Sequence, residues 1–380
     1  MTVGILGGGQ LGYMLALAGY PLGLRFRFLD PSPEAPVGRI AQRTTADYDD
    51  REALEKFANG LELVTYEFEN VPVDAAKFLA ERVPVYPPPG ALETAQDRLN
   101  EKHLFEKLGI VTTEYVAVNA AAELNAAVKK VGLPAVLKTR RMGYDGKGQW
   151  TLQTEGDVAK IKDDFPGVPL ILERLVSFAR ELSVLAVRST NGETAFYPLV
   201  ENHHRAGILR LSLAPPPRTD KTLQRAAEES ARKVMEALDY VGVLAIEFFE
   251  CDGRLLANEM APRVHNSGHW TIEGAVTSQF ENHLRAVLGL PLGSTSPMGH
   301  SAMLNLIGEI PDSAEVLAVP DTHIHLYGKS PRPGRKLGHV TVRAASPEGL
   351  ALKLSELPSF FHRPEFCLDA TLTQRSSARK

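Results

Sequence analysis

Two glutamates on either side of a predicted hairpin turn could bind a divalent cation. Glu247 follows the apolar run "VLAI", and Glu259 lies in "LLANEMA", with Asp252 and Gly253 between them. If the turn has three residues centred on Gly253, the two glutamates face each other across the hairpin. Two adjacent carboxylates raise the pKa of one of them unless a cation lies between them. Mg²⁺ held by both carboxylates and by phosphate oxygens would remove this repulsion.

The turn could also have two residues, Asp252 and Gly253. Side chains alternate along a strand, so this turn would place Glu247 and Glu259 on opposite faces of the hairpin. One glutamate would then face solvent and the other would lie at a strand end. The sequence leaves both turns open.

A lysine followed by a glycine-rich segment could bind nucleotide phosphates. Lys138 ends the strand-like run "LPAVLK", and Gly143, Gly146 and Gly148 lie in the next segment, "RMGYDGKGQW". Glycines let backbone N–H groups approach phosphate oxygens, which the lysine ammonium can also reach. This is not a Walker A motif, because no Gly-Lys-Ser/Thr sequence begins a helix. The alternative is a surface hairpin with an ordinary lysine at its rim.

Four further residues could contact a nucleotide. Glu173 and Glu181 lie near strand ends, where a carboxylate could meet a ribose or an adenine amine, or face solvent. Arg98, in a predicted helix, could contact phosphate. His204, in a predicted loop, could make one polar contact.

The segment "YGKSPRPGRKLGH" concentrates positive charge in a chain whose net charge is -4. It contains Lys329, Arg332, Arg335 and Lys336, with prolines and glycines between them. Such local charge suits a phosphate monoester. A solvated basic loop is the alternative.

The N-terminal segment "VGILGGGQLG" satisfies the G-x-G-x-x-G pattern of dinucleotide-binding folds with Gly7, Gly9 and Gly12. A second apolar run ends in Asp30, at the distance expected for a ribose-binding carboxylate. Taken alone, these features predict an NAD-dependent dehydrogenase. However, strands and helices alternate only as far as "VYPPPG", residues 85–90, which is too short for a complete dinucleotide fold.

The elements that must position these residues follow from the pattern. Residues 1–90 alternate strand, helix, strand, helix and strand, which is typical of a parallel α/β sheet. One helix is predicted over residues 91–109, and the strand that ends in Lys138 comes later. From about residue 170 strands alternate, and they include the hairpin over residues 241–263. The chain ends in a small β-rich unit.

The composition is that of a globular protein, with 380 residues, of which 44% are hydrophobic and 23% charged. The length predicts two or three domains, at roughly 100 to 200 residues each. The negative net charge gives no general attraction to nucleic acid or to an anionic membrane, and no apolar run reaches the roughly 18 to 20 residues of a membrane span. Cys251 and Cys367 form neither a disulfide framework nor a zinc motif, so we expect a cytoplasmic protein.

In this order, the glycine-rich α/β unit, the lysine strand with its glycine loop and the acidic hairpin resemble the ATP-grasp ligases. Within them the chain is similar, over essentially its whole length, to the family that carboxylates 5-aminoimidazole ribonucleotide (AIR). Lys147 departs from the family, because arginine is common there; lysine keeps the charge but loses the bidentate fork. The most specific matches are "GILGGGQLG", "TYEFENV", "GYDGKGQ", "NEMAPRVHNSGHWTIEGAVTSQFENHLRA" and "YGKSPRPGRKLGHV".

The resemblance implies an α/β and α+β protein with an ATP-grasp fold in three parts. A Rossmann-like pre-ATP-grasp domain would span residues 1–95, and a small β-rich C-terminal domain would span residues 299–380. The ATP-grasp domain would span residues 96–298, with a lid over about 110–172 and a Mg-ATP subdomain over about 173–298. A homodimer is implied by the resemblance alone.

The resemblance also assigns ligands to residues. Mg²⁺, with Mn²⁺ as an alternative ion, would bind Glu247 and Glu259. AIR would contact Gln10, Leu11, Glu67, Asn266, Lys329, Arg335 and Lys336. The residues at the reacting groups would be Tyr144, Asp145, Lys147 and Lys329. ATP would contact Arg98, Lys138, Gly143, Tyr144, Asp145, Gly146, Lys147, Gly148, Gln149, Glu173, Arg174, Leu175, Val176, Glu181, His204, Asn258 and Glu259.

The implied reaction, a step of purine (IMP) biosynthesis, has two stages. Bicarbonate attacks the γ-phosphate of ATP to give carboxyphosphate, and the exocyclic amine of AIR then takes the carboxyl group, leaving ADP and phosphate. Carboxyphosphate is lost to water unless the site is closed, so a glycine-hinged lid is expected. Lys138 and Mg²⁺ would neutralise charge on the transferred phosphoryl group. Asp145 is the candidate base for the amine proton, with Glu67 as the alternative.

Three other functions are weighed against this one. A dehydrogenase leaves the residues between Lys138 and Glu259 without a role. A formate-dependent glycinamide ribonucleotide transformylase, a sister ATP-grasp enzyme, shares most nucleotide contacts, although "GYDGKGQ" and "NSGHWT" favour the imidazole substrate. A non-catalytic protein with the same fold is disfavoured, because Lys138, Glu247 and Glu259 are all present.

Overall fold

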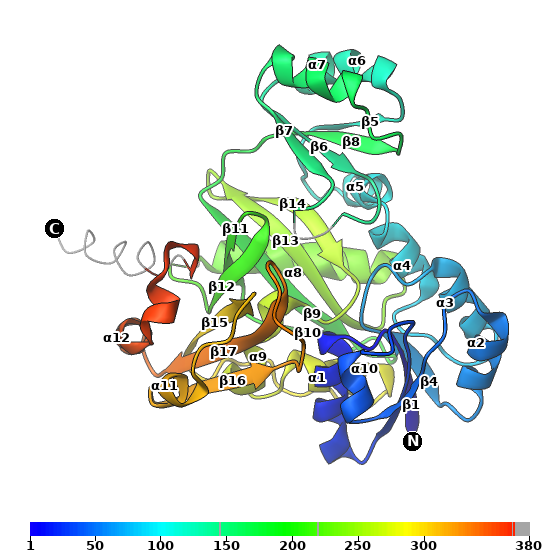
Figure 1. Cartoon of the computed structure of the whole chain (residues 1–380), viewed down its shortest axis with the longest axis vertical. Coiled ribbons are helices and arrows are strands. Elements are labelled where there is room, and N and C mark those ends of the chain that lie inside the picture. Colours follow the sequence, from blue (N-terminus) through cyan, green and yellow to red (C-terminus); the bar gives the residue numbers. More distant parts are fainter. Residues whose placement is uncertain (144–145, 219, 367, 369–380) are drawn as a thin grey trace.

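The computed structural model describes residues 1–380 except 144–145, 219, 367 and 369–380. Within these residues the strands form three sheets, and one of them projects from the rest of the molecule with its two helices (Figure 1). None of the helices that the structure describes has both the length and the hydropathy of a membrane span.

The N-terminal sheet is parallel, in the order β3-β2-β1-β4, and confirms the predicted α/β unit. Its strands are β1 (Thr2–Leu6), β2 (Arg25–Leu29), β3 (Gln42–Thr44) and β4 (Leu63–Tyr66). Its helices are α1 (Gln10–Gly19), α2 (Arg51–Ala58) and α3 (Val73–Ala80).

The single helix predicted over residues 91–109 is wrong, because Asp97 divides it. The Asp97 carboxylate caps the second helix by accepting a hydrogen bond from Leu99 N at 3.0 Å. It also accepts two hydrogen bonds from Arg140, at 2.9 and 2.7 Å, which join the helix to the projecting sheet. The two helices are α4 (Pro89–Ala95) and α5 (Arg98–Lys107).

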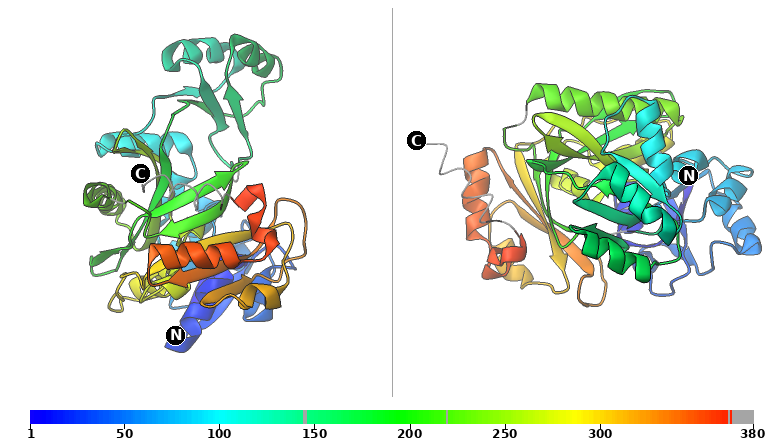
Figure 2. Two further views of the ribbon diagram at one scale, coloured as in Figure 1. Left: turned by 90° about the vertical axis from the view of Figure 1, so that its left-hand side faces the viewer. Right: turned by 90° about the horizontal axis from the view of Figure 1, so that it is seen from above.

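The projecting part, here named the lid, is a four-stranded antiparallel sheet, in the order β5-β8-β6-β7, with α6 and α7 on it. The left-hand view of Figure 2 shows that it stands apart from the other elements. It has its own hydrophobic core, in which Val118, Leu137 and Leu172 are fully buried. Its elements are β5 (Tyr115–Val118), α6 (Leu124–Val131), β6 (Ala135–Thr139), β7 (Gln149–Leu152), α7 (Glu155–Asp163) and β8 (Leu170–Arg174).

The large sheet has the order β14-β13-β9-β11-β12-β15-β17-β16, with β10 paired to β9. Its first strands are β9 (Arg180–Arg188), β10 (Thr194–Phe196), β11 (Val200–Arg205), β12 (Ile208–Ala214), β13 (Gly242–Cys251) and β14 (Arg254–Ala261). The C-terminal strands are β15 (His300–Ile307), β16 (Thr322–Leu326) and β17 (Lys336–Ala344). The helices are α8 (Lys221–Ala237), α9 (Thr271–Gly274), α10 (Gln279–Val287), α11 (Ser313–Leu317) and α12 (Pro347–Glu356).

The C-terminal part is rich in strands, as predicted, but its strands continue the large sheet. Strand β12 pairs with β15 through the register Leu211 to Leu304, and β15 then pairs with β17. Figure 1 shows the orange strands β16 and β17 running on from the green ones. The basic segment between β16 and β17 is therefore fixed to the same sheet as the acidic hairpin.

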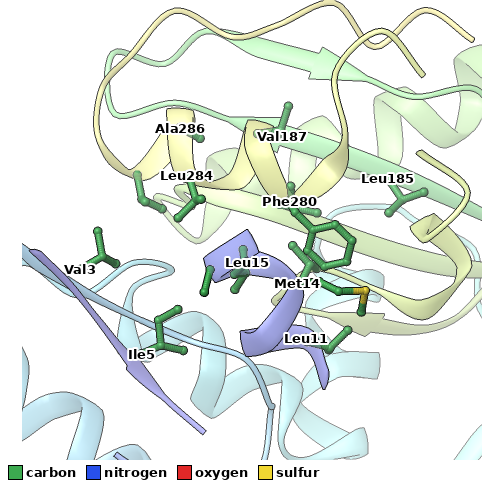
Figure 3. Packing of buried hydrophobic residues seen from close by; sticks show 14 of the residues in the cluster. Val3, Ile5, Leu11, Met14, Leu15, Leu185, Val187, Phe280, Leu284 and Ala286 are labelled. Atoms are coloured by element: carbon green, nitrogen blue, oxygen red, sulfur yellow. The ribbon is translucent and has the colours of Figure 1, made fainter. Parts of the chain in front are cut away.

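The N-terminal unit shares one of its two buried hydrophobic clusters with the large sheet. Leu11, Met14 and Leu15 of α1 belong to one buried cluster with Phe280 and Leu284 of α10 (Figure 3). Helix α1, which follows the glycine motif, is thereby held between its own sheet and α10. The N-terminal residues that were predicted to bind a ligand are placed by this packing.

Candidate active site

A cavity of about 480 Å³ is lined by residues from the N-terminal unit, the lid, the large sheet and the start of β17. It brings together most of the residues predicted to bind ligands, although they are spread from Gln10 to Lys336. The predicted residues that line it are Gln10, Leu11, Arg98, Lys138, Gly143, Gly146, Lys147, Gly148, Gln149, Leu175, Glu181, His204, Glu247, Asn258, Glu259, Asn266 and Lys336.

The other predicted residues are not among those that line the cavity. Arg174 turns toward solvent, where its guanidinium pairs with Glu114 at 2.5 Å. Val176 is half-buried, and Arg335 donates hydrogen bonds to Ser330. Tyr144 and Asp145 lie outside the described residues. Glu67, Glu173 and Lys329 are described below.

Of the two turns that the sequence leaves open for the acidic hairpin, the structure has the shorter one. Strands β13 and β14 are joined by a two-residue turn at Asp252 and Gly253, with φ values of 49° and 73°. Positive φ at both positions is typical of a type I′ turn, for which Asp-Gly is a preferred sequence. Continued without interruption, this register would place Glu247 and Glu259 on opposite faces.

A β-bulge restores the predicted pairing of the glutamates. Phe248 pairs with Ala257 and Glu247 pairs with Glu259, so Asn258 is the extra residue of β14. The bulge interrupts the alternation of side chains, and Asn258 and Glu259 both line the cavity. The cross-strand pair is therefore confirmed.

The surroundings of Glu247 and Glu259 give the two carboxyl groups different pKa values. Burial, followed by the charge of Glu259, raises the pKa of Glu247 to about 7. Burial also raises the pKa of Glu259, but Arg98, whose Nη1 lies 2.6 Å from Glu259 Oε2, brings it down to about 2. The pair thus carries more than one negative charge at neutral pH. A divalent cation between the carboxylates would lower this repulsion.

The donor set fits a Mg²⁺ ion that a nucleotide brings with it. In the part of the chain that the structure describes, no group of three or more His, Cys, Asp and Glu side chains is arranged to hold a metal ion. Two carboxylates suffice for Mg²⁺ when phosphate oxygens and water supply the remaining ligands. Glu247 and Glu259 would provide these two.

Lys138 and Glu173 form a buried ion pair at the lid side of the cavity. Lys138 Nζ lies 3.0 Å from Glu173 Oε2, and Lys102 Nζ lies 3.7 Å from the same oxygen. Burial raises the pKa of Glu173, but the two lysines more than offset it and lower the pKa. Glu173 is only 3% exposed, so its predicted alternative place in solvent is excluded. The pair orients the ammonium of Lys138, which lines the cavity.

The glycine-rich segment packs closely against Thr139, the residue after Lys138, and this contact requires glycine at position 148. Thr139 N donates to Gly148 O at 2.8 Å, so the two ends of the loop lie close together. A Cβ at Gly148 would lie 2.6 Å from Thr139 Oγ1, and its φ of 69° also favours glycine. The described glycines of the segment line the cavity rather than a free surface.

His204 lies in strand β11 and not in a loop as predicted. Its Nδ1 is 2.8 Å from Glu181 Oε2 on the neighbouring strand β9. Burial lowers the pKa of His204, but Glu181 and Glu247 outweigh burial and raise it above its ordinary value. A cationic His204 at the cavity would favour an anionic ligand.

The glycine motif binds a carboxylate of the chain itself. Gly9 N donates to Glu67 Oε1 at 2.5 Å, and Gly12 N donates to Glu67 Oε2 at 2.8 Å. Gly8 N donates to Asp30 at 2.6 Å, so Asp30 fixes the turn instead of binding a ribose. In dinucleotide folds the amides at this helix end bind pyrophosphate. Glu67 occupies them in this structure, which argues against the dehydrogenase.

Lys329 reaches from the basic segment to the N-terminal unit. Its Nζ donates to Gln10 Oε1, so the two predicted AIR residues are in direct contact. Burial lowers the pKa of Lys329 to about 8; Glu67 opposes this shift, whereas the neighbouring cations, Arg335 first, add to it. Lys336, at the start of β17, lines the cavity nearby.

Arg263 and His265 line the cavity and were not predicted from the sequence. Arg263 is paired with Glu69 through a hydrogen bond from its Nε, and His265 Nε2 lies 3.4 Å from Glu247 Oε1. Burial, then Arg263, lowers the pKa of His265 to about 3, so the imidazole is neutral. Both residues lie in the quoted segment "NEMAPRVHNSGH", which was the signal that could have revealed them.

Family models match three consecutive parts of the chain. They are the ribonucleotide synthetase preATP-grasp domain over residues 1–96, the ATP-grasp domain over residues 103–280, and the phosphoribosylaminoimidazole carboxylase C-terminal domain over residues 301–352. These matches agree with the lid, the acidic hairpin and the cavity described above. The chain therefore has the ATP-grasp fold, and the predicted fold class is confirmed.

Individual relatives show to which family of ATP-grasp proteins the chain belongs. The chain is 54% identical over 357 residues to the N5-carboxyaminoimidazole ribonucleotide synthase of Pseudomonas aeruginosa, covering 94% of this chain and 98% of that protein. It is 60% identical to the N5-carboxyaminoimidazole ribonucleotide synthetase of Thermus thermophilus in its crystal structure, with a TM-score of 0.90 over 93% of this chain and 97% of the other. An Aspergillus clavatus enzyme, solved with ADP and AIR, is 33% identical with a TM-score of 0.86, covering 97% and 98%. The chain belongs to the N5-carboxyaminoimidazole ribonucleotide synthase family.

Proposed function

We propose that the protein carboxylates AIR with ATP and bicarbonate, giving N5-carboxyaminoimidazole ribonucleotide, ADP and phosphate. It is an ATP-grasp ligase of purine biosynthesis, and its substrates are small molecules. The observation that carries this function is the cavity to which the acidic hairpin, the lid lysine, the glycine motif helix and the basic segment all contribute. A family member solved with ADP and AIR supports the same ligands here.

ATP would lie between the lid and the large sheet, with its phosphates at Lys138 and the described glycines of the loop. Glu247 and Glu259 would hold Mg²⁺, which when bound supplies positive charge to the phosphates. Arg98 keeps Glu259 ionised and so keeps one carboxylate ready for the cation. Lys138 stabilises the charge that develops on the transferred phosphoryl group.

AIR would lie on the side of the cavity nearest the N-terminal unit. Lys329, Arg335 and Lys336 suit its phosphate, and Gln10 and Asn266 offer hydrogen bonds to its polar edges. The contact between Lys329 and Gln10 supports this placement, because it joins the two predicted AIR segments.

Bicarbonate and carboxyphosphate need a cationic group between the two nucleotides. Arg263 lines the cavity and is fixed by Glu69, and its planar guanidinium suits a carboxylate. The amine proton of AIR needs a base, for which Asp145 stays our prediction. Glu67 is a weaker candidate, because both of its oxygens accept hydrogen bonds from Gly9 and Gly12.

A homodimer and a cytoplasmic location are further predictions for the protein. The glycinamide ribonucleotide alternative is disfavoured by the relatives, which bear the AIR-carboxylating name. The proposed reaction in the cavity depends neither on the formation of a homodimer nor on the location of the protein in the cell.

The proposed function is tested by measuring phosphate release with purified protein. Release is expected to require ATP, AIR and bicarbonate together, and a divalent cation. Omitting AIR or bicarbonate should reduce it to background. Turnover of glycinamide ribonucleotide with formate, in place of AIR with bicarbonate, would show that the proposal is wrong.

The catalytic efficiency for AIR is expected to fall as the pH rises above about 8. The pKa of Lys329 is lowered to about 8, so its ammonium is charged at pH 7 and largely neutral at pH 9, where it no longer attracts the AIR phosphate. The measurement is kcat/KM for AIR from about pH 6.5 to about pH 9.5. In the Lys329→Arg variant the decline should disappear, because a guanidinium keeps its charge over this range.

Lys329→Ala supplies the control for this pH dependence. It should raise KM for AIR by about tenfold at pH 7, through the loss of a charged contact, and remove the alkaline decline. A decline that persists unchanged in the alanine variant would assign it to another group.

A further inference from the structure

Strand β14, which carries Asn258 and Glu259, is the edge strand of the large sheet. Among the described residues, its outer side meets another extended segment only in an isolated bridge between Thr112 and Ala257. Helix α5 lies beside the rest of this edge (Figure 1), and its side chains bind backbone groups that a strand would otherwise bind. An edge covered in this way keeps the geometry that the covering helix imposes on it.

Lys102 of α5 binds the backbone of the bulge. Its Nζ donates to the carbonyl oxygen of Asn258 at 2.9 Å and to that of Ala257 at 3.3 Å. It also donates to Thr112 Oγ1 at 2.7 Å, and this hydroxyl donates in turn to the Ala257 carbonyl at 2.8 Å. An ammonium has three donors, and here all three have acceptors.

Burial of the charged Lys102 side chain costs free energy, which argues for a specific role of this residue. Its side chain is 1% exposed, and burial lowers its pKa, although Glu173 at 3.7 Å partly compensates. A buried charge is tolerated only when its hydrogen bonds and charge are satisfied. An apolar side chain would fill the same space without this cost but could not bind the two carbonyl groups.

Two neighbours on the same face of α5 hold the strand beyond the bulge. Glu101 Oε1 accepts a hydrogen bond from Met260 N at 2.5 Å, and Arg98 binds the Glu259 carboxylate at 2.6 Å. Residues separated by three and four positions lie together on a helix, so one face of α5 contacts β14 before, at and after Glu259.

We propose that Lys102 is a positioning residue for the divalent cation: by binding the carbonyl groups of Ala257 and Asn258, it fixes the bulge that turns Asn258 and Glu259 together into the cavity. Without the bulge, the alternation along β14 would place these two side chains on opposite faces. Lys102 is absent from the cavity lining, so it acts on the cation site through the backbone of β14. The inference rests on the proposed function, in which Glu259 binds the cation.

The test measures the affinity of the protein for Mn²⁺ in the presence of ADP, by electron paramagnetic resonance of the free ion. The Lys102→Met variant keeps the length of the side chain but cannot donate hydrogen bonds. Its dissociation constant for Mn²⁺ is expected to rise about tenfold or more, as the loss of a charge-assisted hydrogen bond at the site implies. The measurement needs no turnover.

The matched control is Phe105→Leu, which changes a fully buried residue of the same helix that does not line the cavity. It should lower Tm while leaving the affinity for Mn²⁺ unchanged. If Phe105→Leu weakens Mn²⁺ binding as much as Lys102→Met does, the effect is one of stability and the inference is overturned. Wild-type affinity in Lys102→Met overturns it as well.

A second variant covers the case in which Lys102→Met does not fold. Thr112→Val removes the hydroxyl that links Lys102 to the Ala257 carbonyl and is expected to weaken Mn²⁺ binding about twofold to fivefold. Unchanged binding in a folded Thr112→Val protein would contradict the inference. Should wild-type protein bind Mn²⁺ with ADP but release no phosphate with AIR and bicarbonate, the proposed function fails while the positioning role of Lys102 stands.

Discussion

Replacing Glu259 with glutamine is expected to lower kcat for AIR-dependent phosphate release by about a thousandfold or more. Glutamine has the shape of glutamate but no charge, so a divalent cation at the hairpin loses one of its two carboxylates. Arg98, which now binds Glu259 at 2.6 Å, would be left as an unpaired cation beside the same position. The measurement is phosphate release at saturating ATP, AIR and bicarbonate.

Two comparisons make the Glu259→Gln result specific. Raising the Mg²⁺ concentration should not restore turnover, because Arg98 then repels the ion. Glu229→Gln, on the exposed side of α8, removes a glutamate outside the cavity lining and should leave kcat within about twofold of wild type. Wild-type kinetics in Glu259→Gln would remove Glu259 from the proposed metal site.

Lys138→Ala has the second largest expected effect, a loss of about a hundredfold in kcat/KM for ATP. The ammonium of Lys138 is oriented by Glu173 and would stabilise charge on the transferred phosphoryl group. Removal of one such donor usually lowers kcat by roughly a hundredfold to a thousandfold. Glu173 stays partly compensated by Lys102 at 3.7 Å, so the variant is expected to fold. Steady-state kinetics with ATP as the varied substrate give the answer.

Lys130→Ala is the matched control for Lys138→Ala. Lys130 is exposed on the lid helix α6, and its removal takes one positive charge from the lid without altering the cavity. Its kinetics should equal those of wild type. If Lys138→Ala also behaves like wild type, the nucleotide phosphates lie elsewhere.

Much of the fold could be predicted because its signals are local. Alternating strands and helices at the N-terminus, and apolar runs that end at Lys138 and Glu173, identify their elements without knowledge of the tertiary structure. Strand β11 was missed because "VENHHR" is polar, whereas an inner strand is expected to be apolar. Its Asn202 is buried through hydrogen bonds to Ser183 and Ser212, partners that no local pattern reveals.

The break between α4 and α5 could have been predicted. Asp97 directly before Arg98 is a typical N-cap, and an N-cap inside a predicted helix indicates a new start. Glu101 and Lys102 follow Arg98 at three and four positions, so one face of α5 carries three charged residues. That face contacts β14, but the sequence does not show that the contact is buried.

The pairing of Glu247 with Glu259 was tied to a three-residue turn, whereas the structure forms it with the two-residue turn that was the alternative. The Asp252-Gly253 turn follows the usual preference of this dipeptide. The bulge at Asn258 then shifts the register of β14 by one residue, which pairs Glu247 with Glu259. A bulge has no reliable sequence signal, because it depends on what binds the extra backbone groups. Here those partners lie on α5, more than a hundred residues earlier in the chain.

The occupation of the glycine motif by Glu67 could not be read from the motif itself. The same three glycines serve a turn that accepts either a pyrophosphate or a side-chain carboxylate. The partner of Gly9 comes from the end of β4, 58 positions away. A Cβ at Gly9 would lie 2.5 Å from Glu67 Oε1, so the glycines are needed for the carboxylate as much as they would be for a cofactor.

The arrangement of hydrophobic cores divides the protein differently from its three family domains. The N-terminal unit shares a buried cluster with α10 and the large sheet, and the C-terminal strands extend that sheet, so we expect these parts to unfold together. The lid has a core of its own. Among the described residues the lid shares no buried cluster with the remainder, so it can rotate against that remainder during a catalytic cycle without exposing the interior of either.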